Sequence, residues 1–406
     1  MVLVGLLARV AYIVVARCYR FDLQYWSGFE MALIGRYLVA GRGFILQADS
    51  GPSAWTAPVY PLVVALAFRL FGVFSHAAAF ALLAFNSIFA AFTSWTIYRI
   101  SGRLCNETVA LWSGWVWALL PSSFYFSVFW IWETTLSAFL LSALFLLTLV
   151  LEERSRLSYW CGYGVLWGIA GLTNPSLLVW LPFAAGWIVV HYNRRRQPLV
   201  LAVIVSALVF CLTLSPWLVR NYFAFGNPLL LRGGFGINLR AGNNPAAQGW
   251  WVTDYTCNNP SFLEQYKRFG ESEFVAYEGH MARQWIAEHP RRFTVLTLRR
   301  IVFFWAGIPH QGAGEGKNAV FVLFSLLSLL GLALAIKRGM PGAFLFISLL
   351  LVYPLVYYIT FPQPRYRHVI EPEMLTLAVL CVWAAVAHFR HQPSDLQSTL
   401  AKAARA

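Results

Sequence analysis

The sequence predicts an α-helical polytopic membrane protein. Of its 406 residues, 59% are hydrophobic, 17% are aromatic and only 12% are charged. The mean hydropathy of +0.60 lies outside the range of soluble globular proteins. Apolar stretches near the roughly 20 residues that span a bilayer recur along the chain, and the backbone there satisfies its hydrogen bonds within helices.

The expected membrane helices form about eleven apolar segments that satisfy the hydropathy rule. The first, "MVLVGLLARVAYIVVARCYRF", has neither a basic start nor a small-residue cleavage site, so we interpret it as a membrane helix and not as a removed signal. By residue number the segments are 2–17, 58–73, 77–98, 108–127, 133–151, 159–173, 175–192, 198–217, 319–336, 342–360 and 374–389.

Two polar stretches divide the chain. Residues 18–57 form a polar, aromatic loop, and residues 218–318 form a region rich in Gly, Asn, Arg and Glu that is too long for an ordinary connection. The expected parts are an N-terminal membrane module (1–217, with the loop 18–57), an external region with an interfacial helix near 291–307 (218–318), C-terminal membrane helices (319–390) and a cytoplasmic tail (391–406).

The basic residues indicate the orientation in the membrane. The formal net charge of +14 could suggest a nucleic acid partner, but the basic residues cluster in short loops beside apolar segments, which is typical of cytoplasmic anchoring. We therefore expect membrane lipids and no nucleic acid as partners. The anchors are "RSR" (154–156), "NRRRQP" (193–198), "KRG" (337–339) and "HFRHQ" (388–392).

Counting crossings from these anchors identifies the external segments. They are Glu133, Asn174, 218–318 and 361–372. The stretch 58–98 does not fit this count, because it reads as two helices yet must cross an odd number of times if Arg99 and Arg103 are cytoplasmic. Either one of its two segments is re-entrant, or these arginines do not mark the cytoplasmic side.

The first external loop contains a candidate catalytic carboxylate. Within it, "EMALIGRYLVAG" has helical periodicity and ends at Gly41 or Gly43, so Glu30 lies near the start of a short amphipathic helix. A carboxylate at a helix N-terminus is favoured by the helix dipole. Glu30 could alternatively cap this helix or pair with Arg36. Asp22 and Asp49 are weaker candidates, which we interpret as solvated loop residues.

A second candidate is Glu133, in "FWIWETTLSAFLL". It is expected at the outer end of an apolar helix between tryptophans, where a charge is costly and usually functional. The alternative is simple capping of the helix N-terminus.

A glycine-rich stretch after the segment 198–217, "SPWLVRNYFAFGNPLLLRGGFGINLRAGNN", has the composition of an oxygen-binding site. Exposed backbone amides and guanidinium groups donate hydrogen bonds to phosphate and hydroxyl oxygens. The alternative is interfacial anchoring to lipid headgroups. The polar side chains of this stretch are Arg220, Asn221, Arg232, Arg240 and Asn243.

The stretch "FPQPRYRHVIEP", residues 361–372, concentrates charge between two apolar segments. Arg365, Arg367 and His368 are expected just above the membrane, where the phosphate of a lipid would reach them with its tail in the hydrocarbon. Glu371 would hold one of the arginines in place. The alternative is a self-neutralising Arg–Glu cluster that caps the helix 374–389.

Seven motifs in this order resemble bacterial members of the dolichyl-phosphate-mannose–protein mannosyltransferase-like superfamily, which are membrane glycosyltransferases of the GT-C fold. The resemblance covers nearly the whole chain. The motifs are "FEMALIGRYLVAGRGF", "GPSAWTAPVYPL", "WIWETTLS", "LTNP", "SPWLVRNYFAFGNP", "GINLRAGNN" and "YYITFPQPRYRHVIEP".

The resemblance implies an inverting transfer of a sugar from a polyprenyl phosphate to an acceptor protein, lipid or glycan on the outer side of the bacterial inner membrane. It implies an acidic residue in the first external loop and a second at the mouth of a later helix, which Glu133 matches. Relatives often show an Asp-Glu pair where this chain has Ser27 and Gly28, so Glu30 is favoured over Asp22 as the base.

The expected chemistry needs a base for the acceptor hydroxyl and cations for the phosphate leaving group of an oxocarbenium-like transition state. The alternative function is a transporter or flippase of a lipid-linked sugar, although transporters usually place charges near the midplane and show repeated halves. A non-catalytic scaffold would not need these carboxylates and arginines.

The sequence contains no recognisable metal motif. The six cysteines are scattered, without a C-x-x-C pair, and are expected to pack as small hydrophobic residues. A divalent metal ion remains open as a cofactor only if Glu30 and Glu133 converge in space.

Overall fold

A computed structural model gives the fold. It describes residues 1–27, 29–151, 156–194, 200–226, 231–251, 259–309 and 315–403. The basic anchors at 154–156 and 193–198, like Gly28, lie wholly or partly outside these ranges.

The apolar segments predicted from the sequence are all helical, so the predicted fold class is confirmed. They correspond to α1 (Val2–Val15), α4 (Val59–Phe71), α5 (His76–Leu104), α6 (Glu107–Leu119), α7 (Pro121–Val128), α8 (Thr134–Leu151), α9 (Leu157–Thr173), the 3₁₀ helix η1 (Pro175–Trp180), α10 (Leu181–Arg194), α11 (Val200–Phe225), α16 (Glu315–Lys337), α17 (Ala343–Val352), α18 (Leu355–Ile359) and α20 (Glu371–Ala403).

Shorter helices occupy the two polar regions. The first loop contains α2 (Leu23–Ser27) and α3 (Glu30–Val39), the second region contains α12 (Phe235–Gly242), α13 (Pro260–Phe269), α14 (Glu271–Glu288) and α15 (Pro290–Ala306), and α19 (Pro364–His368) lies between α18 and α20.

Five helices within the described ranges are long and apolar enough to cross a membrane. They are α5, α8, α11, the part of α16 from Asn318 and the part of α20 up to His388. Of these, α8 is the most buried, while α11 and α16 are mostly exposed, so their apolar surfaces are available to lipid.

The stretch 58–98 contains the short helix α4 and most of the long helix α5. The Tyr60 hydroxyl, near the start of α4, donates to Asn86 Oδ1, about a third of the way along α5. Phe68, near the end of α4, packs on Phe74, just before α5 begins. Helix α4 therefore runs back along only the first part of α5, and this stretch contains one long helix and one short one.

The predicted helix 108–127 is interrupted at a proline, and a buried arginine of α1 binds both sides of the break. Leu120 is extended and Pro121 opens α7, where its missing N–H costs nothing. The last carbonyls of α6 lack helical partners, and Arg9 of α1 fills this need by donating to Ala118 O at 2.9 Å. Arg9 also donates to Ser123 Oγ of α7 at 2.6 Å, so it joins both sides of the break.

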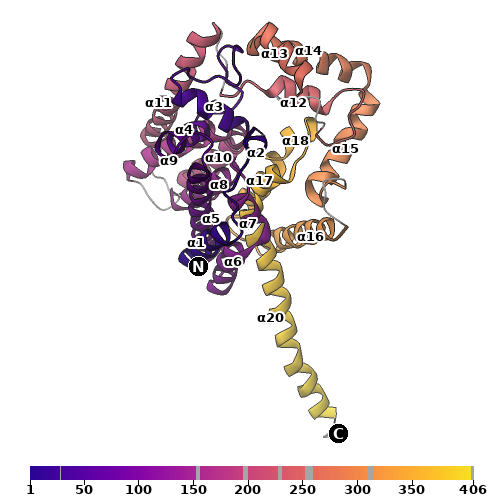
Figure 1. Cartoon of the computed structure of the whole chain (residues 1–406). Helices are drawn as coiled ribbons and strands as arrows, with labels where there is room; N and C mark the ends of the chain where they lie inside the picture. The colour runs from indigo at the N-terminus through magenta and orange to yellow at the C-terminus, as the bar shows by residue number, and fades with distance from the viewer. Residues whose placement is uncertain are drawn as a thin grey trace.

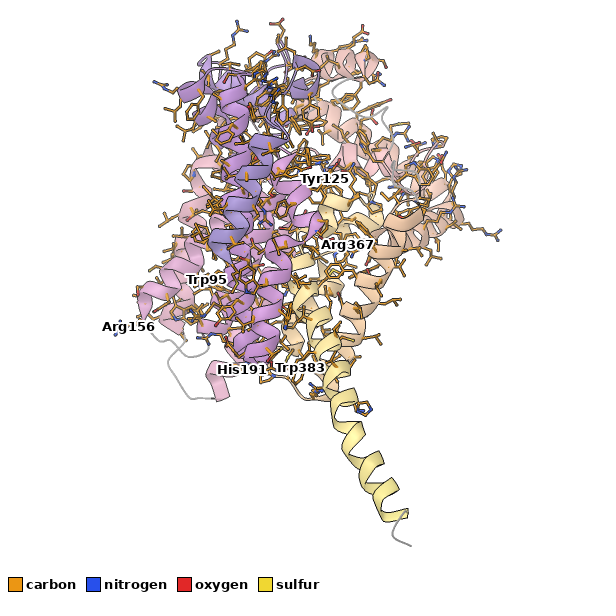
Figure 2. All side chains as sticks on the ribbon, turned by 60° about the horizontal axis from the view of Figure 1, so that its bottom comes forward. Trp95, Tyr125, Arg156, His191, Arg367 and Trp383 are labelled. Atoms are coloured by element: carbon orange, nitrogen blue, oxygen red, sulfur yellow. The ribbon has the colours of Figure 1, made fainter. Side chains whose placement is uncertain are left out.

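Helices α1–α11 form one bundle, from which α12–α15 extend to one side near the end opposite the N-terminus (Figure 1). Helices α17 and α18 lie between these two parts, and α20 projects from the end of the bundle where the N-terminus lies. His191 and Trp383 lie toward that same end, and Arg367 lies further along the molecule (Figure 2).

Candidate active site

The chain enters α8 through a segment, 129–133, that neighbouring side chains hold in place. Asn86 Nδ2 donates to the carbonyl of Trp130 at 2.8 Å. The carbonyl of Glu133 accepts from Ser137 N at 2.7 Å, which is the first hydrogen bond of α8. Glu133 therefore lies at the mouth of this helix, as the sequence predicts.

The Glu133 side chain is buried, with a relative exposure of 5%. Its Oε1 lies 3.9 Å from Nη1 of Arg232, and its Oε2 has no hydrogen-bond partner among the described residues. Burial raises the pKa of Glu133, and the charges of Arg232 and Arg365 oppose this rise. The site thus contains a carboxylate whose charge is incompletely compensated by the protein.

Glu133 opens onto a cavity of about 270 Å³, near the lower end of the roughly 300–1,000 Å³ typical of ligand pockets. Its walls come from the start of α8, η1, α12 and the α18–α19 connection. The polar residues that line it are Glu133, Thr134, Asn174, Ser176, Arg232, Asn238, Tyr357, Thr360, Arg365 and Tyr366.

Arg365 is the charged residue of "FPQPRYRHVIEP" that lines this cavity. Its guanidinium lies over the ring of Trp132, 4.2 Å from the centroid, and Nη2 donates to the Tyr366 hydroxyl at 3.2 Å. Its Nε has no hydrogen-bond partner among the described residues. An aromatic platform thus orients a guanidinium that retains an unused donor.

Arg367 and His368 lie instead in a buried cluster with Glu371. Arg367 Nε lies 3.7 Å from Glu371 Oε1, and His368 Nδ1 lies 2.8 Å from Glu371 Oε2. The imidazole also stacks on Trp117. Arg367 and His368 are thus paired with Glu371 at the start of α20, as in the Arg–Glu cluster interpretation, whereas Arg365 lines the cavity.

Arg232 connects the second polar region to Glu133. Its Nε donates to the carbonyl of Trp55 in the first loop at 3.0 Å, which leaves Nη1 beside the carboxylate. Arg232 is about a quarter exposed, so a ligand can reach it.

Arg220 and Asn221, expected to bind ligand, hold the first loop against α11. Arg220 donates to the carbonyls of Ser53 at 2.9 Å and Phe44 at 3.2 Å, and to Asn221 Oδ1 at 2.9 Å. These three acceptors use both terminal nitrogens of the guanidinium. Their role in the structure is to position the loop, and the cavity walls do not include them.

A buried carboxylate fixes the same loop from the other side. Glu271 accepts hydrogen bonds from Ser53 Oγ at 2.6 Å, Ala54 N at 2.7 Å and the Tyr266 hydroxyl at 2.6 Å. Glu271 thereby joins the first loop to α13 and α14. The two polar regions, far apart in the sequence, are one structural unit over the bundle.

Asn243 is likewise structural, and it belongs to a cluster around Arg300 of α15. Asn243 Nδ2 donates to Ile359 O at 2.9 Å. Arg300 donates to Tyr358 O and Ile359 O at 3.2 and 3.1 Å, and also to Gly242 O. Arg300 is fully buried and joins the C-terminal ends of α12 and α18. The end of α18 directly precedes residues 360 and 361, which line the cavity.

Glu30 and Asp22, two of the three acidic residues of the first loop, lie in different surroundings. Glu30 begins α3, as predicted, and is partly exposed. It does not line the cavity, but its charge acts on two residues that do: it contributes to the raised pKa of Glu133 and interacts with Arg365. Asp22 is exposed and accepts a hydrogen bond from Tyr25 N at 2.6 Å at the start of α2.

Sequence reasoning did not single out the aromatic wall of the cavity. The rings of Tyr357 and Tyr366 stack at 4.3 Å with an interplanar angle of 12°. The Tyr353 hydroxyl donates to the Tyr366 carbonyl at 3.1 Å. The spacing of Tyr353 and Tyr357, one helical turn apart, is the signal that could have identified this wall. Asn174 and Asn238 also line the cavity.

The donor atoms around the cavity do not form a protein-only metal site. In the described part of the chain, no group of three or more His, Cys, Asp or Glu residues is arranged to hold a metal ion. Glu30 and Glu133 are close enough to interact electrostatically, but Arg232 and Arg365 compete with a cation for the Glu133 carboxylate. No step proposed below uses a metal ion.

Replacing Glu133 by glutamine is expected to maintain or raise stability while lowering activity. Because its pKa is higher in the folded chain than its ordinary value of 4.5, the folded state binds the proton more tightly. The contribution of Glu133 to the free energy of unfolding is therefore present at low pH and is lost as the pH rises from 4.5 through the raised pKa. Apparent melting temperatures at pH 5 and 8 measure this: the pH dependence should diminish in Glu133→Gln. A melting temperature that drops strongly at pH 8 would mean that the ionised form stabilises the fold.

The fold is similar to that of a solved membrane enzyme, an archaeal oligosaccharyltransferase. The oligosaccharyltransferase AglB of the archaeon Archaeoglobus fulgidus, in complex with an inhibitory peptide and a dolichol-phosphate, matches 93% of this chain and 48% of its own, with a TM-score of 0.53 and 13% identity. Its apo form matches 98% of this chain and 51% of its own, with a TM-score of 0.55 and 13% identity. The chain thus spans about half the length of the archaeal enzyme.

The sequence resemblance is also confirmed. The profile of the dolichyl-phosphate-mannose-protein mannosyltransferase family matches residues 55–219, which include α4–α11 up to Val219. ArnT of Cupriavidus metallidurans bound to undecaprenyl phosphate matches 91% of this chain and 76% of its own at 13% identity, with a TM-score of 0.37, too low to compare the folds in detail. No curated protein matches the sequence significantly.

Proposed function

We propose that this chain transfers a sugar from a polyprenyl-phosphate donor to an acceptor hydroxyl or phosphate, with inversion, on the outer side of the bacterial inner membrane. The observation that carries the proposal is one cavity with an incompletely paired carboxylate, Glu133, and two cations that reach it, Arg232 and Arg365. The family profile and the archaeal fold support the same reaction class.

In the proposed reaction, Arg365 binds the donor phosphate and Arg232 assists it. The acceptor oxygen attacks the anomeric carbon, and the bond between this carbon and the phosphate oxygen breaks with its electron pair staying on the polyprenyl phosphate. No general acid is required, because a phosphate leaves as a stable anion. Guanidinium groups in a site sheltered from water stabilise the charge that develops there.

Inversion restricts the side of the sugar on which the base lies. The nucleophile enters opposite the leaving group, so the base lies on the side of the sugar away from the phosphate-binding arginines. Glu133 contacts Arg232 and is therefore placed on the leaving-group side. We assign Glu30 as the base that takes the acceptor proton, and Glu133 as the residue that orients the arginines.

The test uses purified protein in proteoliposomes with radiolabelled polyprenyl-phosphate mannose and, in parallel, polyprenyl-phosphate glucose and arabinose. A transferase releases free polyprenyl phosphate as the label moves to an acceptor fraction. A flippase leaves the donor intact and only changes the leaflet in which it is found. Movement of intact donor without release of polyprenyl phosphate would replace the proposed function by transport.

The topology is a separate prediction. In a cysteine-free background, a cysteine at the exposed position 246 is expected to react with a membrane-impermeant maleimide added from outside, and one at position 195 is not, because the basic loop lies in the cytoplasm. Labelling is compared in intact and permeabilised cells. Labelling of 195 but not 246 in intact cells would reverse the orientation.

A further inference from the structure

A second cavity, formed by α12, α13 and α14, lies outside the site described above. Its volume is also about 270 Å³. One helix separates the two cavities: Phe235 and Asn238 of α12 line the first, and Arg240 lines the second. Residues two apart on a helix differ by about 200° in direction, so α12 presents opposite faces to the two cavities.

This dividing helix is held rigidly against α14. A Cβ on Gly236 would overlap with the carbonyl of Val275, and Gly236 lies directly against Gly279. On the same side, Ile237 packs with Phe262 and Phe274 in a buried cluster. The second cavity therefore has a preformed floor.

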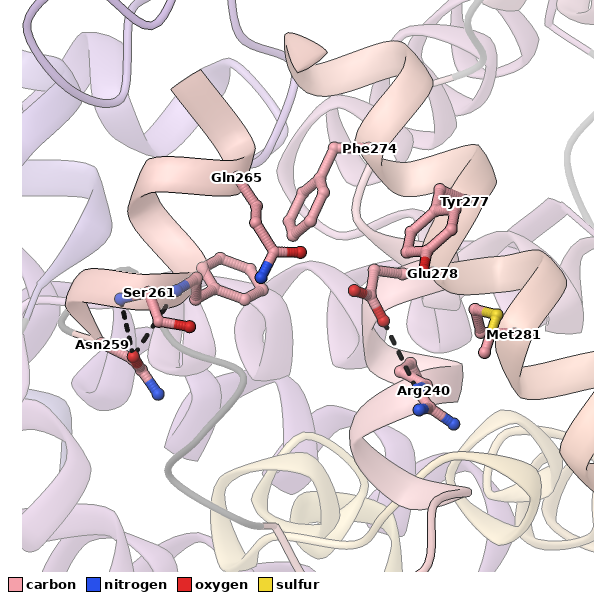
Figure 3. A pocket seen from close by; sticks show the side chains of 9 residues that line it. Arg240, Asn259, Ser261, Gln265, Phe274, Tyr277, Glu278 and Met281 are labelled. Carbon is pink, nitrogen blue, oxygen red and sulfur yellow. Dashed lines mark hydrogen bonds and ion pairs between the residues drawn. The ribbon is translucent and has the colours of Figure 1, made fainter. Parts of the chain in front are cut away.

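The polar groups of this cavity are mixed in type and nearly neutral in sum (Figure 3). Arg240 Nε pairs with Glu278 Oε2 at 3.5 Å, and Arg240 is the one cation among the lining residues. Gln265 and Ser261 each offer a donor and an acceptor. A free phosphate would have to compete with Glu278 for Arg240, whereas a ligand rich in hydroxyl groups can use all four side chains.

An aromatic surface borders these groups. Tyr277 lines the cavity and is 51% exposed, and its ring lies nearly parallel to that of Phe269, at 6.3 Å and 17°. A half-exposed ring with a polar tip covers the apolar face of a ligand while its hydroxyl meets the polar edge. A sugar ring has such a face of C–H groups and such an edge of hydroxyl groups.

We propose that the α12–α13–α14 cavity is a saccharide-binding subsite that takes a neutral sugar residue. The shared wall α12 places this sugar next to the catalytic cavity, so its source is either a sugar of the acceptor or a distal sugar of the donor. The assignment of these sources rests on the proposed transferase function, but sugar binding itself does not.

The binding test needs no transfer reaction. Saturation-transfer NMR on the detergent-solubilised protein is run with mannotriose, maltotriose and chitotriose as probes. At least one should bind, and Tyr277→Ala and Gln265→Ala should each weaken that binding by about tenfold or more. Tyr222→Ala, which removes a similarly exposed tyrosine on α11, is the matched control and should bind as wild type does. Absence of binding by all three probes, or unchanged binding in both cavity variants, overturns the proposal.

Kinetics then separate the two sources. A raised KM for the acceptor in Tyr277→Ala assigns the sugar to the acceptor, and a raised KM for the donor assigns it to the donor. Saccharide binding that is lost in Tyr277→Ala, in a protein without transferase activity, refutes the proposed function and leaves the subsite standing. Transfer with both KM values unchanged in Tyr277→Ala and Gln265→Ala refutes the subsite and leaves the function standing.

Discussion

Replacing Glu30 by glutamine is expected to lower the turnover number for sugar transfer by about 10²–10⁴-fold, the usual contribution of a general base. Glutamine preserves the shape of the side chain at the start of α3 but cannot accept the acceptor proton. Because a base acts in the transition state, the KM for the donor should remain close to that of the wild type. Initial rates over a range of donor concentrations measure both quantities.

Two variants control this experiment. Asp22→Asn changes another carboxylate of the first loop, which is exposed and accepts a hydrogen bond from Tyr25 N, and should keep nearly full activity. Glu133→Gln should be milder than Glu30→Gln, since Glu133 acts through Arg232 and Arg365. Full turnover in Glu30→Gln together with a large loss in Asp22→Asn would move the base to Asp22, and a loss confined to Glu133→Gln would move it to the cavity carboxylate.

The second large effect is expected at Arg365. Arg365→Lys keeps the positive charge but replaces a planar fork by a point charge, so the KM for the donor should rise by about 10–100-fold, equivalent to roughly 1.5–3 kcal/mol for hydrogen bonds to charged groups. Turnover at saturating donor should fall less. The measurement is donor KM and turnover on the same preparations.

Arg367→Lys is the matched control for this substitution, two residues away in the same helix. Arg367 is paired with Glu371 and lies over the ring of Phe321 at 4.3 Å, away from the cavity. Its replacement should lower the melting temperature and leave the donor KM near the wild-type value. The reverse pattern, with donor use lost in Arg367→Lys and kept in Arg365→Lys, would place the phosphate in the buried cluster.

The sequence could predict the helices because hydropathy is a local property. Where single residues interrupt a helix, the prediction joined pieces that the structure separates. Pro121 begins a new helix after the extended Leu120, and α17 and α18 meet at Tyr353 and Pro354 within the predicted segment 342–360. Both breaks contain a proline, but a proline does not by itself predict a break, because a membrane helix can also accommodate one, as Pro216 within α11 demonstrates.

The partners of the buried arginines could be predicted from the sequence only where they are close in the chain. The pairing of Arg367 with Glu371 agrees with their i,i+4 spacing and with the Arg–Glu cluster that the sequence predicts as one alternative. By contrast, the partners of Arg220 are backbone carbonyls more than 160 residues away, and those of Arg300 are carbonyls at the ends of α12 and α18. Only the tertiary fold determines which arginines bind such carbonyls and which, like Arg365, line the cavity.

Recognition of a polyprenyl phosphate by Arg365 in the Glu133 cavity is the step on which the proposed function depends. Its most direct test is binding of undecaprenyl phosphate, compared with undecaprenol, to the purified protein by native mass spectrometry, because this lipid is the product of transfer whatever the sugar. We expect saturable binding of the phosphate over the alcohol, weakened in Arg365→Lys and unchanged in Arg367→Lys. Equal binding of the two lipids, or equal binding of the phosphate by wild type and Arg365→Lys, would contradict it.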